Sequence, residues 1–413
     1  MTDAPDLAEF RDEAARWLTG HAQPIATGVG RWGDGSDGVA VFHDLLVEDE
    51  RELIGRLAAW ERTKYEAGYG VLTWPAEYGG RELDPVYDDI FGEEQERFET
   101  PDPHELVSVT RNLVAPTLRL LGSESQRALV PALLRAEQLC CQLFSEPSAG
   151  SDLATLSTRA VRDGDGWIVN GQKVWSSGAH FAQWGELIAR TDPALPKHEG
   201  LTAFLLPMDT PGVDVRPLRQ MSGGSSFCEV FLTDVRIPDT LRLGEVGAGW
   251  KVALTTLGFE RGNSSASSSI GGSFEQVLAL TQHLGTVGHP VTRSQLAQVY
   301  AYEFLAVVAH RRDQAARRGG APLGAIGSVR KLQWTQKMSL IADVVTDQLG
   351  PLLTADTGEW GTFAWTEHVL GAPGYRIAGG SDEIQRNIIS ERLLGLPAEP
   401  RGDRTTPWRD LPR

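Results

Sequence analysis

The sequence predicts an α+β chain of several domains: a helical N-terminal domain, a middle β-barrel domain and a C-terminal helical bundle. Three observations lead to this fold class. Apolar residues recur with helical spacing up to about residue 138, alternate with a period of two up to residue 243, and then return to helical spacing. A chain of 413 residues is also too long for one ordinary core. The predicted boundaries are 1–138, 139–243 and 244–397, with a C-terminal tail at 398–413.

The first domain is predicted from two amphipathic stripes with loops between them. A glycine-rich stretch at 27–41 is expected to be a mobile loop, and a second loop holds Trp74–Gly80. A helix over 122–138 follows, with Ser123 or Ser125 as its N-cap. The two stripes consist of Leu7, Phe10, Ala14 and Leu18, and of Leu53, Leu57 and Trp60.

The middle domain is predicted from short strands separated by Pro, Gly and Asp. The turn Asp163–Gly166 reads Asp-Gly-Asp-Gly between two alternating runs, which is a strong hairpin signal. With so many strands and turns, closure into a small barrel or sandwich is expected. The other predicted strands cover residues 185–191, 201–207, 213–218 and 225–238.

The last domain begins at a glycine-rich hinge, Gly244–Trp250, where the chain returns to helix. One long helix is predicted over 292–318, of a length typical of a bundle. A second helix carries a continuous apolar stripe that must be buried against other helices. That stripe consists of Val329, Leu332, Met338, Ile341, Val345 and Leu349.

Composition excludes several classes of function. The formal net charge of -16 argues against a nucleic-acid surface and against an anionic membrane surface, since both require clustered Lys and Arg. The acidic, amphipathic N-terminus is not a signal peptide, and no apolar run approaches membrane-spanning length. Cys140, Cys141 and Cys228 are expected to be reduced thiols of a cytoplasmic protein, and no spacing of ligands predicts a metal site.

Four motifs lie at the joints of this α–β–α order. They read TWPAEYGG from Thr73, CQLFSEPSAGSDLATL from Cys141, GWIVNGQKVWSSGA from Gly166 and GGSDEIQRNIISERLLGLP from Gly379. In this order they resemble the signatures of the acyl-CoA dehydrogenase superfamily, over about Asp6 to Pro397. The resemblance implies an FAD-dependent acyl-CoA dehydrogenase of lipid metabolism and β-oxidation, with a four-helix bundle as its last domain. It also implies an acyl-CoA substrate, an electron-transfer flavoprotein as acceptor, and a homodimer, a homotetramer or a heteromeric assembly.

The resemblance also assigns cofactor-binding residues. Gln142, Phe144 and Ser145 are expected along the isoalloxazine ring, Trp175 against the ring and Ser177 near N5. Taken without the resemblance, Trp175 reads as a core aromatic residue at a strand end and Ser145 as an ordinary turn residue. The resemblance places the chain after the glycine pair of the last motif against the adenosine half of FAD; glycines permit close backbone approach there, and a helix start offers free N–H groups. The remaining expected contacts are Ser151, which also faces the pantetheine of the substrate, and Ser176, Gly380, Ser381 and Glu383.

A base is needed to remove the α-proton of the thioester while a hydride leaves the β-carbon for flavin N5. Many family members carry a glutamate one residue before the second glycine of the last motif, but here that position is Gly379. A subset of the family, including isovaleryl- and long-chain enzymes, places the base on the first helix of the C-terminal domain. The match falls on Glu260, followed by Arg261, which is expected to contact the substrate. Gly379 still supplies a backbone N–H to the thioester oxygen; without the resemblance, Glu260 reads as an exposed acid on a solvated helix.

The sequence also departs from the family. Ser148 stands where a glycine is common, no Arg-x-x-Phe-Gly motif appears near Arg293, and the Gln-x-x-Gly-Gly loop is missing, which leaves the cross-subunit flavin contacts open. Three rival functions remain: a flavin oxidase or monooxygenase of the same fold, a non-catalytic subunit of a heteromeric enzyme, and a dehydrogenase of carrier-protein thioesters. Small Ala378 and Gly379 favour a branched, cyclic or long acyl group.

Overall fold

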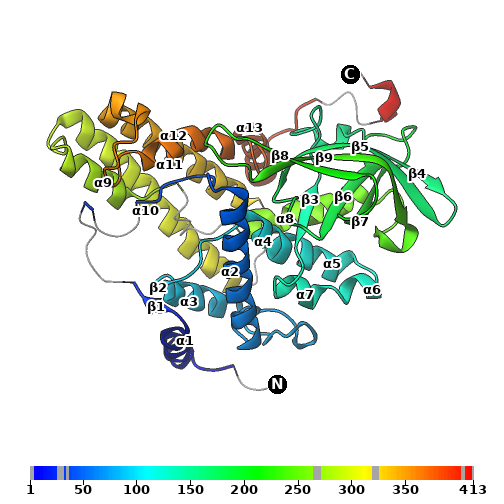
Figure 1. Cartoon of the computed structure of the whole chain (residues 1–413), viewed down its shortest axis with the longest axis horizontal. Helices are drawn as coiled ribbons and strands as arrows, with labels where there is room; N and C mark the ends of the chain where they lie inside the picture. The colour runs from blue at the N-terminus through cyan, green and yellow to red at the C-terminus, as the bar shows by residue number, and fades with distance from the viewer. Residues whose placement is uncertain are drawn as a thin grey trace.

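The computed structural model describes residues 4–25, 32–33, 37–263, 271–318, 325–400 and 405–411, without the side chains of 260–263 and 317–318. Within these ranges the chain runs from helices through a sheet and back to helices, which confirms the predicted fold class. Figure 1 shows the sheet at one end of the molecule and helices α9–α12 at the other. The loop predicted at 27–41 lies largely outside the described residues.

The N-terminal helices form where the predicted stripes meet an apolar partner. Helix α1 begins after Asp6, whose carboxylate accepts hydrogen bonds from backbone N–H groups of the first turn. The predicted stripe of α1 is buried except for Leu7, and the ring of Phe10 packs edge-on against Tyr87 at 4.9 Å between ring centres. The elements of this region are α1 Leu7–His21, β1 Gln23–Pro24, α2 Val47–Glu66, η1 Ala76–Tyr78, α3 Pro85–Gln95, β2 Phe98–Glu99, α4 Glu105–Val109, η2 Thr110–Val114, α5 Ala115–Leu121, α6 Glu124–Arg127 and α7 Val130–Leu134.

The single helix predicted over 122–138 was wrong, because the structure has two short helices there. Ser123 is the N-cap of α6 and forms a capping box with Gln126, as one of the two predicted caps. Helix α6 ends at Arg127, and α7 begins with Pro131 in its first turn. Proline has no N–H to donate to the preceding turn, so a helix passing through this position would lose a hydrogen bond.

The middle of the chain forms an eight-stranded sheet in the order β10-β7-β6-β4-β5-β9-β8, with β3 parallel to β6. Strands β4 and β5 form the predicted hairpin, since Asp163 pairs with Gly166 across the turn. The strands are β3 Cys140–Leu143, β4 Arg159–Asp163, β5 Gly166–Ser177, β6 Trp184–Arg190, β7 Leu201–Pro207, β8 Val213–Leu218, β9 Phe227–Pro238 and β10 Arg242–Leu243, with turns η3 Leu153–Thr155 and η4 Asp239–Leu241.

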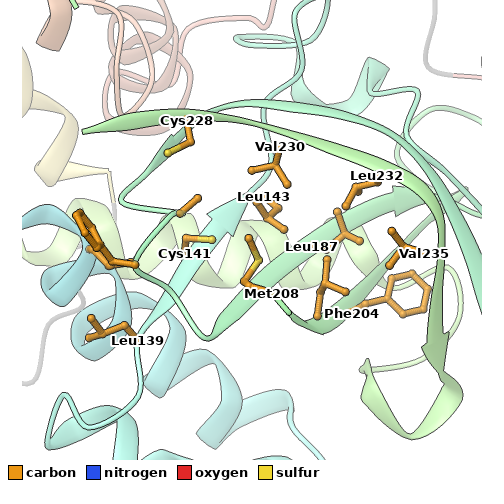
Figure 2. Close-up of a cluster of buried hydrophobic side chains, with 14 of the residues drawn as sticks. Leu139, Cys141, Leu143, Leu187, Phe204, Met208, Cys228, Val230, Leu232 and Val235 are labelled. Atoms are coloured by element: carbon orange, nitrogen blue, oxygen red, sulfur yellow. The ribbon is translucent and has the colours of Figure 1, made fainter. Parts of the chain in front are cut away.

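Both faces of the central strands are buried. One face encloses a core in which side chains of β3, β6, β7 and β9 point toward one another (Figure 2). The other face packs on the N-terminal helices and on helix α8 Gly249–Asn263 through residues such as Ile188 and Leu205. This explains why β6 and β7 read as nearly continuous apolar runs rather than as alternating ones. The enclosed core includes Cys141, Leu143, Leu187, Phe204, Met208, Cys228, Val230 and Leu232.

A buried carboxyl group anchors helix α8 to the sheet. The hydroxyl of Thr256 on α8 donates to Glu186 on β6 at 2.7 Å, and lies 3.0 Å from the hydroxyl of Thr117 on α5. All three side chains are fully buried. Burial raises the pKa of Glu186 to about 8, and the hydrogen bond from Thr256 offsets this only in part. The carboxyl group of Glu186 is therefore mostly neutral at pH 7.

The C-terminal helices pack as a bundle around one apolar core, as predicted. The predicted stripe on α11 is buried at Met338, Ile341, Val345 and Leu349, and the preceding part of the stripe is half-buried. The bundle consists of α9 Phe274–His283, α10 Pro290–Arg318, α11 Ile326–Leu349 and α12 Ala364–Tyr375, followed by α13 Asp382–Ile388, with shorter turns η5 Gly350–Thr354, η6 Ile389–Leu393 and η7 Trp408–Asp410.

The part of the chain that the structure describes gives no support for a membrane span, a metal site or a reactive thiol. No described helix combines the length and the apolar character needed to cross a bilayer. The described His, Cys, Asp and Glu side chains form no group of three or more suited to a metal ion. Cys140, Cys141 and Cys228 are buried free thiols, and burial raises the pKa of each of them. None of these thiols is therefore a ready nucleophile at neutral pH.

Glu186→Gln is expected to remove a pH dependence of stability. A carboxyl group whose pKa is raised in the folded state stabilises the fold in acid, and this contribution is lost as the pH rises toward about 8. Relative to the variant, the parent protein should lose roughly 1.4 kcal/mol per pH unit between about pH 5 and pH 8. Thermal unfolding of both proteins across this range measures the effect, with Glu199→Gln at an exposed position as the control. Parallel profiles for parent and Glu186→Gln would contradict the prediction.

Candidate active site

The motifs that begin at Cys141 and at Gly166 meet where the end of β3 lies beside a bulge in β5. The backbone N–H of Val174 donates to the carbonyl oxygen of Ser145 at 2.9 Å, and Lys173 Nζ donates to that of Phe144 at 2.9 Å. The register of β5 against β9 shifts between Lys173 and Ser176. Such a bulge turns side chains out of the regular alternation of a strand. The structure therefore brings Phe144 and Ser145 next to the segment that carries Trp175.

A buried ion pair holds this junction together. Lys173 Nζ lies 2.9 Å from Glu146 Oε1, and both side chains are almost completely buried. The same carboxylate accepts hydrogen bonds from the backbone N–H and the hydroxyl of Ser157 and from the backbone N–H of Thr158, at 2.7–2.8 Å. Burial alone would raise the pKa of Glu146, but the charge of Lys173 and these hydrogen bonds prevail and lower it to about 2. The Glu146 carboxylate is therefore ionised at neutral pH.

Trp175 is held in an unusual conformation at the bulge. Its φ angle is 63°, in the left-handed region that residues other than glycine rarely adopt, at a strain of about 1–3 kcal/mol. Its side chain is 62% exposed, and its ring contacts Phe227 edge-on at 6.0 Å between ring centres. An aromatic side chain this exposed is not a core residue. A strained backbone that presents an open indole face suits the stacking of a planar ligand.

A chain of aromatic rings joins Trp175 to the segment before the glycine pair. Phe227 packs against Phe42 at 5.4 Å, and Phe42 stacks on Tyr375 at 4.8 Å between ring centres. Phe42 precedes α2, Phe227 begins β9 and Tyr375 ends α12, so all three predicted domains meet here. Tyr375 lies four residues before Gly379 in the sequence. The last motif and the middle-domain motifs are thus parts of one region.

The glycine pair forms a fixed loop at the start of α13. Gly379 and Gly380 have φ angles of 63° and 82°. Gln385 Nε2 donates to both glycine carbonyl oxygens at 3.0 Å, and Lys331 Nζ donates to that of Gly380 at 2.8 Å. In a trans peptide the N–H points opposite to the carbonyl, so the N–H groups of Gly380 and Ser381 face away from Gln385. Ser381 is also the N-cap of α13.

Three predicted residues are not linked to this region by the hydrogen bonds of the described chain. The exposed Glu383 pairs with Arg386 at 3.3 Å on the surface of α13, a pair that contributes little to stability. Ser151 is exposed on the loop after β3. Ser176 is buried, and because neighbouring strand residues point to opposite faces, its hydroxyl lies away from Ser177.

The predicted base lies on a described helix, but its side chain lies outside the described residues. The backbone of residues 260 and 261 continues helix α8, whose position on the sheet is set by Thr256. The side chains of Glu260 and Arg261 are not among those that the structure describes. Both assignments therefore stay predictions.

Two features of the site were missed by sequence reasoning. Lys173 is at an alternate position of β5 from the buried Val169 and Trp167, so it points to the same face of the strand. A lysine at a buried strand position indicates a buried counter-ion, which here is Glu146. Glu50 Oε2, on α2, lies 3.8 Å from His180 Nε2, three residues after the end of β5. No local sequence pattern predicts this contact, because the two residues come from different domains.

The residues of this region fit a flavin ring. A flavin ring requires hydrogen-bond donors along its polar edge and an apolar surface against its face. Gln142 Nε2 is a buried donor without a hydrogen-bond partner among the described residues. Trp175 offers an open aromatic face. Ser145 lies two residues after the end of β3, and Ser177 is the last residue of β5. These residues fit an isoalloxazine ring.

Comparisons with known proteins find similar domains and relatives along most of the chain. Models of the N-terminal, middle and C-terminal domains of acyl-CoA dehydrogenases match residues 46–137, 141–235 and 247–394. The acyl-CoA dehydrogenase IpdE1 of Mycobacterium tuberculosis is 36% identical over 404 residues, which cover 96% of this chain and 100% of that protein. FadE34 of the same organism, also an acyl-CoA dehydrogenase, is 39% identical over 328 residues, covering 78% of this chain and 44% of that protein.

Solved structures show the same fold. One, titled "Tcur3481-Tcur3483 steroid ACAD", has a TM-score of 0.75 and 26% identity, covering 97% of this chain and 100% of that chain. The ChsE4-ChsE5 complex from Mycobacterium tuberculosis has a TM-score of 0.71 and 25% identity, covering 96% of this chain and 100% of that chain.

Trp175→Gly is expected to separate cofactor binding from folding. Glycine adopts the left-handed backbone without strain, so the cofactor-free variant should unfold within about 1 kcal/mol of the parent. Its affinity for FAD should fall at least about tenfold, because the stacking face is lost. Thermal unfolding and fluorescence titration with FAD measure the two effects. In the control Trp167→Gly, removal of a buried ring that packs on Phe204 should instead cost about 3–5 kcal/mol of stability. Unchanged FAD affinity in Trp175→Gly would refute the assignment.

Proposed function

This chain belongs to the acyl-CoA dehydrogenase family of FAD-dependent oxidoreductases, and we propose that it dehydrogenates an acyl-CoA thioester between Cα and Cβ with Glu260 as the base. The observation that carries this proposal is the meeting of three domains around Trp175. There the flavin motifs of β3 and β5 come together with the Gly379 segment through the rings of Phe227, Phe42 and Tyr375.

The protein has two roles in the proposed reaction: it binds the cofactor and the substrate, and it removes a proton. FAD, when bound, would supply the acceptor for the hydride of the β-carbon, and an electron-transfer flavoprotein is the proposed electron partner. Gln142, Ser145, Trp175 and Ser177 hold and orient the ring. The backbone N–H at Gly379 binds the thioester oxygen, and a donor of this kind typically lowers the barrier by about 3 kcal/mol.

Glu260 removes the α-proton. Residue 260 follows Thr256 by four positions in α8, the helix that Thr256 anchors to the sheet. In general, a bound acyl group that excludes water from a carboxylate strengthens that carboxylate as a base. Many relatives hold the base at the position of Gly379, which here has no side chain. A base at Glu260 and a glycine at position 379 are therefore consistent with each other: the base has moved from one position to the other.

The acyl group is proposed to be cyclic, of a steroid-derived kind. Ala378 and Gly379 have the smallest side chains available and leave space in front of the glycine loop. A steroid acyl-CoA dehydrogenase, as its title calls it, shares the fold over nearly the whole chain at 26% identity. A panel of straight-chain, branched and cyclic acyl-CoA thioesters, scored by anaerobic bleaching of the flavin, tests this proposal. Bleaching by straight-chain thioesters alone would contradict it.

Glu260→Gln is expected to abolish most of the reaction while leaving binding intact. The substitution is nearly isosteric, so the fold, the FAD content and thioester affinity should be kept. The rate of flavin reduction in stopped-flow experiments should fall roughly 10²- to 10⁴-fold, because an amide does not accept the α-proton. Glu275→Gln, at an exposed position in the first turn of α9, is the matched control. A rate within a few-fold of the parent would show that Glu260 is not the base.

We also propose that the chain assembles through an exposed apolar face of α10. This face carries Tyr300, Phe304, Val307 and Val308, spaced so that they share one side of the helix, and each is more than 40% exposed. Nearer the start of α10, Leu296 and Val299 are buried in the bundle. A contiguous apolar face of this kind is typical of a subunit interface.

Phe304→Asp is expected to weaken this assembly. Light scattering should show the parent as a dimer or larger, because burial of the α10 face drives association. A charge at the centre of that face should shift the variant toward the monomer. The control Leu120→Asp, at an exposed apolar residue on α5, should leave the assembly unchanged. A stable parent monomer that retains FAD would contradict the proposal.

A further inference from the structure

The C-terminal segment of the chain packs on the middle domain, and the proposed mechanism gives it no part. Residues 405–411, called the C-terminal strap below, lie beside the sheet (red in Figure 1). The backbone N–H of Trp408 donates to the carbonyl oxygen of Leu195, between β6 and β7, at 2.9 Å. Pro407 pairs with Pro196 in an antiparallel bridge. The strap therefore has a fixed register along the β6–β7 loop.

The side chain of Trp408 reaches a second loop, residues 147–157, which lies between β3 and β4. Its Nε1–H donates to the carbonyl oxygen of Thr155 at 3.0 Å, across 253 positions of sequence. Its ring lies against the guanidinium group of Arg190 on β6, with 4.8 Å between the guanidinium carbon and the ring centre. Trp408 thus connects the strap to the 147–157 loop directly and to β6 through Arg190.

Arg190 holds the second half of the 147–157 loop. Its Nη2 donates to the carbonyl oxygen of Ala154 at 2.6 Å, and its Nη1 donates to that of Lys197 at 2.9 Å. Burial lowers the pKa of Arg190 to about 10, so the group is still a cation at neutral pH. Because the face of an indole ring stabilises such a cation, Trp408 helps to fix the guanidinium group that holds the loop.

The strap also acts on the exposed part of the loop, through Lys197. This residue directly follows Pro196, the bridge partner of the strap, and its Nζ lies 2.7 Å from Asp152 Oδ2. Asp152 is the neighbour of Ser151, and both residues are exposed. Two routes, one through Arg190 and one through Lys197, therefore connect the strap to the segment around Ser151.

The ends of the 147–157 loop are held without the strap. Glu146 accepts the backbone N–H of Ser157 and is paired with Lys173. This ion pair belongs to the junction that carries Trp175, and the strap makes no part of it. Loss of the strap should therefore loosen the middle of the loop and leave the flavin site in place.

We propose that Trp408 is a positioning residue that holds the 147–157 loop in the conformation that binds the pantetheine arm of the substrate. This inference rests on the proposed function and on the contact of Ser151 with pantetheine that the family resemblance implies. A binding segment that is already ordered avoids the loss of conformational entropy that binding imposes on a mobile one. The strap therefore contributes to substrate affinity without touching the substrate.

The test measures binding of coenzyme A, which carries the pantetheine arm and no acyl group, to the FAD-loaded protein by calorimetry. Trp408→Ala removes both side-chain contacts, and a chain that ends at Pro400 lacks the strap. Trp408→Phe keeps a ring against Arg190 but has no N–H to donate to Thr155. Trp360→Ala is the matched control, since Trp360 is also half-buried but lies in the C-terminal domain before α12.

Trp408→Ala and the truncated chain should raise the Kd for coenzyme A and the KM for a thioester about tenfold. Trp408→Phe should raise both about threefold, because the ring contact is kept. The kcat of flavin bleaching, and the affinity of the cofactor-free protein for FAD, should stay within about twofold of the parent in every variant. Trp360→Ala should match the parent in all four quantities. This split between KM and kcat distinguishes a role in substrate binding from a role in the chemical step.

A Kd in Trp408→Ala within twofold of the parent would overturn the proposal, as would an equal loss of FAD affinity, which marks a general structural role. If neither Trp408→Ala nor the truncated chain folds, an unchanged Kd in Trp408→Phe overturns it. If no thioester bleaches the parent, the proposed function fails, whereas the Kd values for coenzyme A still decide the role of Trp408. A parent that does not bind coenzyme A overturns the inference.

Discussion

The buried ion pair between Lys173 and Glu146 is the constraint on which the rest of the site depends. It ties the loop after β3 to the bulge of β5, fixes the carbonyl of Phe144 and so sets the backbone at Trp175. Buried ion pairs contribute little net stability compared with apolar residues of the same volume, whereas removal of one partner leaves an unpaired buried charge. Its value here is geometric, since it keeps a strained, exposed tryptophan in one orientation.

The N-terminal domain is part of the site and not only a support for it. It supplies Phe42 to the aromatic chain, and it supplies Glu50, which positions both the α4 segment and the end of β5. A ligand held where three domains meet stabilises their packing by mass action, because it binds only the assembled state. Cofactor binding and domain docking are therefore expected to be coupled in this protein.

Three buried carboxyl groups differ in their pKa because their neighbouring groups differ. Glu146 faces Lys173 and is ionised, since the pKa of Glu146 is lowered to about 2. The pKa of Glu50 is lowered by its histidine partners, against the effect of burial. Glu186 has a threonine hydroxyl and no cation, so burial raises its pKa to about 8 and it stays mostly neutral. Among these three groups, the charged Glu146 and Glu50 lie beside segments that lead into or out of the sheet, while the mostly neutral Glu186 anchors α8.

By itself the sequence determined the order of helices, sheet and helices and the hairpin at Asp163–Gly166, because both follow from local periodicity and turn residues. Its motifs also singled out Trp175 and Gly379, whose neighbourhood the structure then showed to be shared. Only the tertiary structure decided that the predicted helix over 122–138 is two helices and that Glu50 lies beside His180. Contacts of this second kind join segments far apart in the chain, and they depend on how domains pack, which no local pattern of residues records.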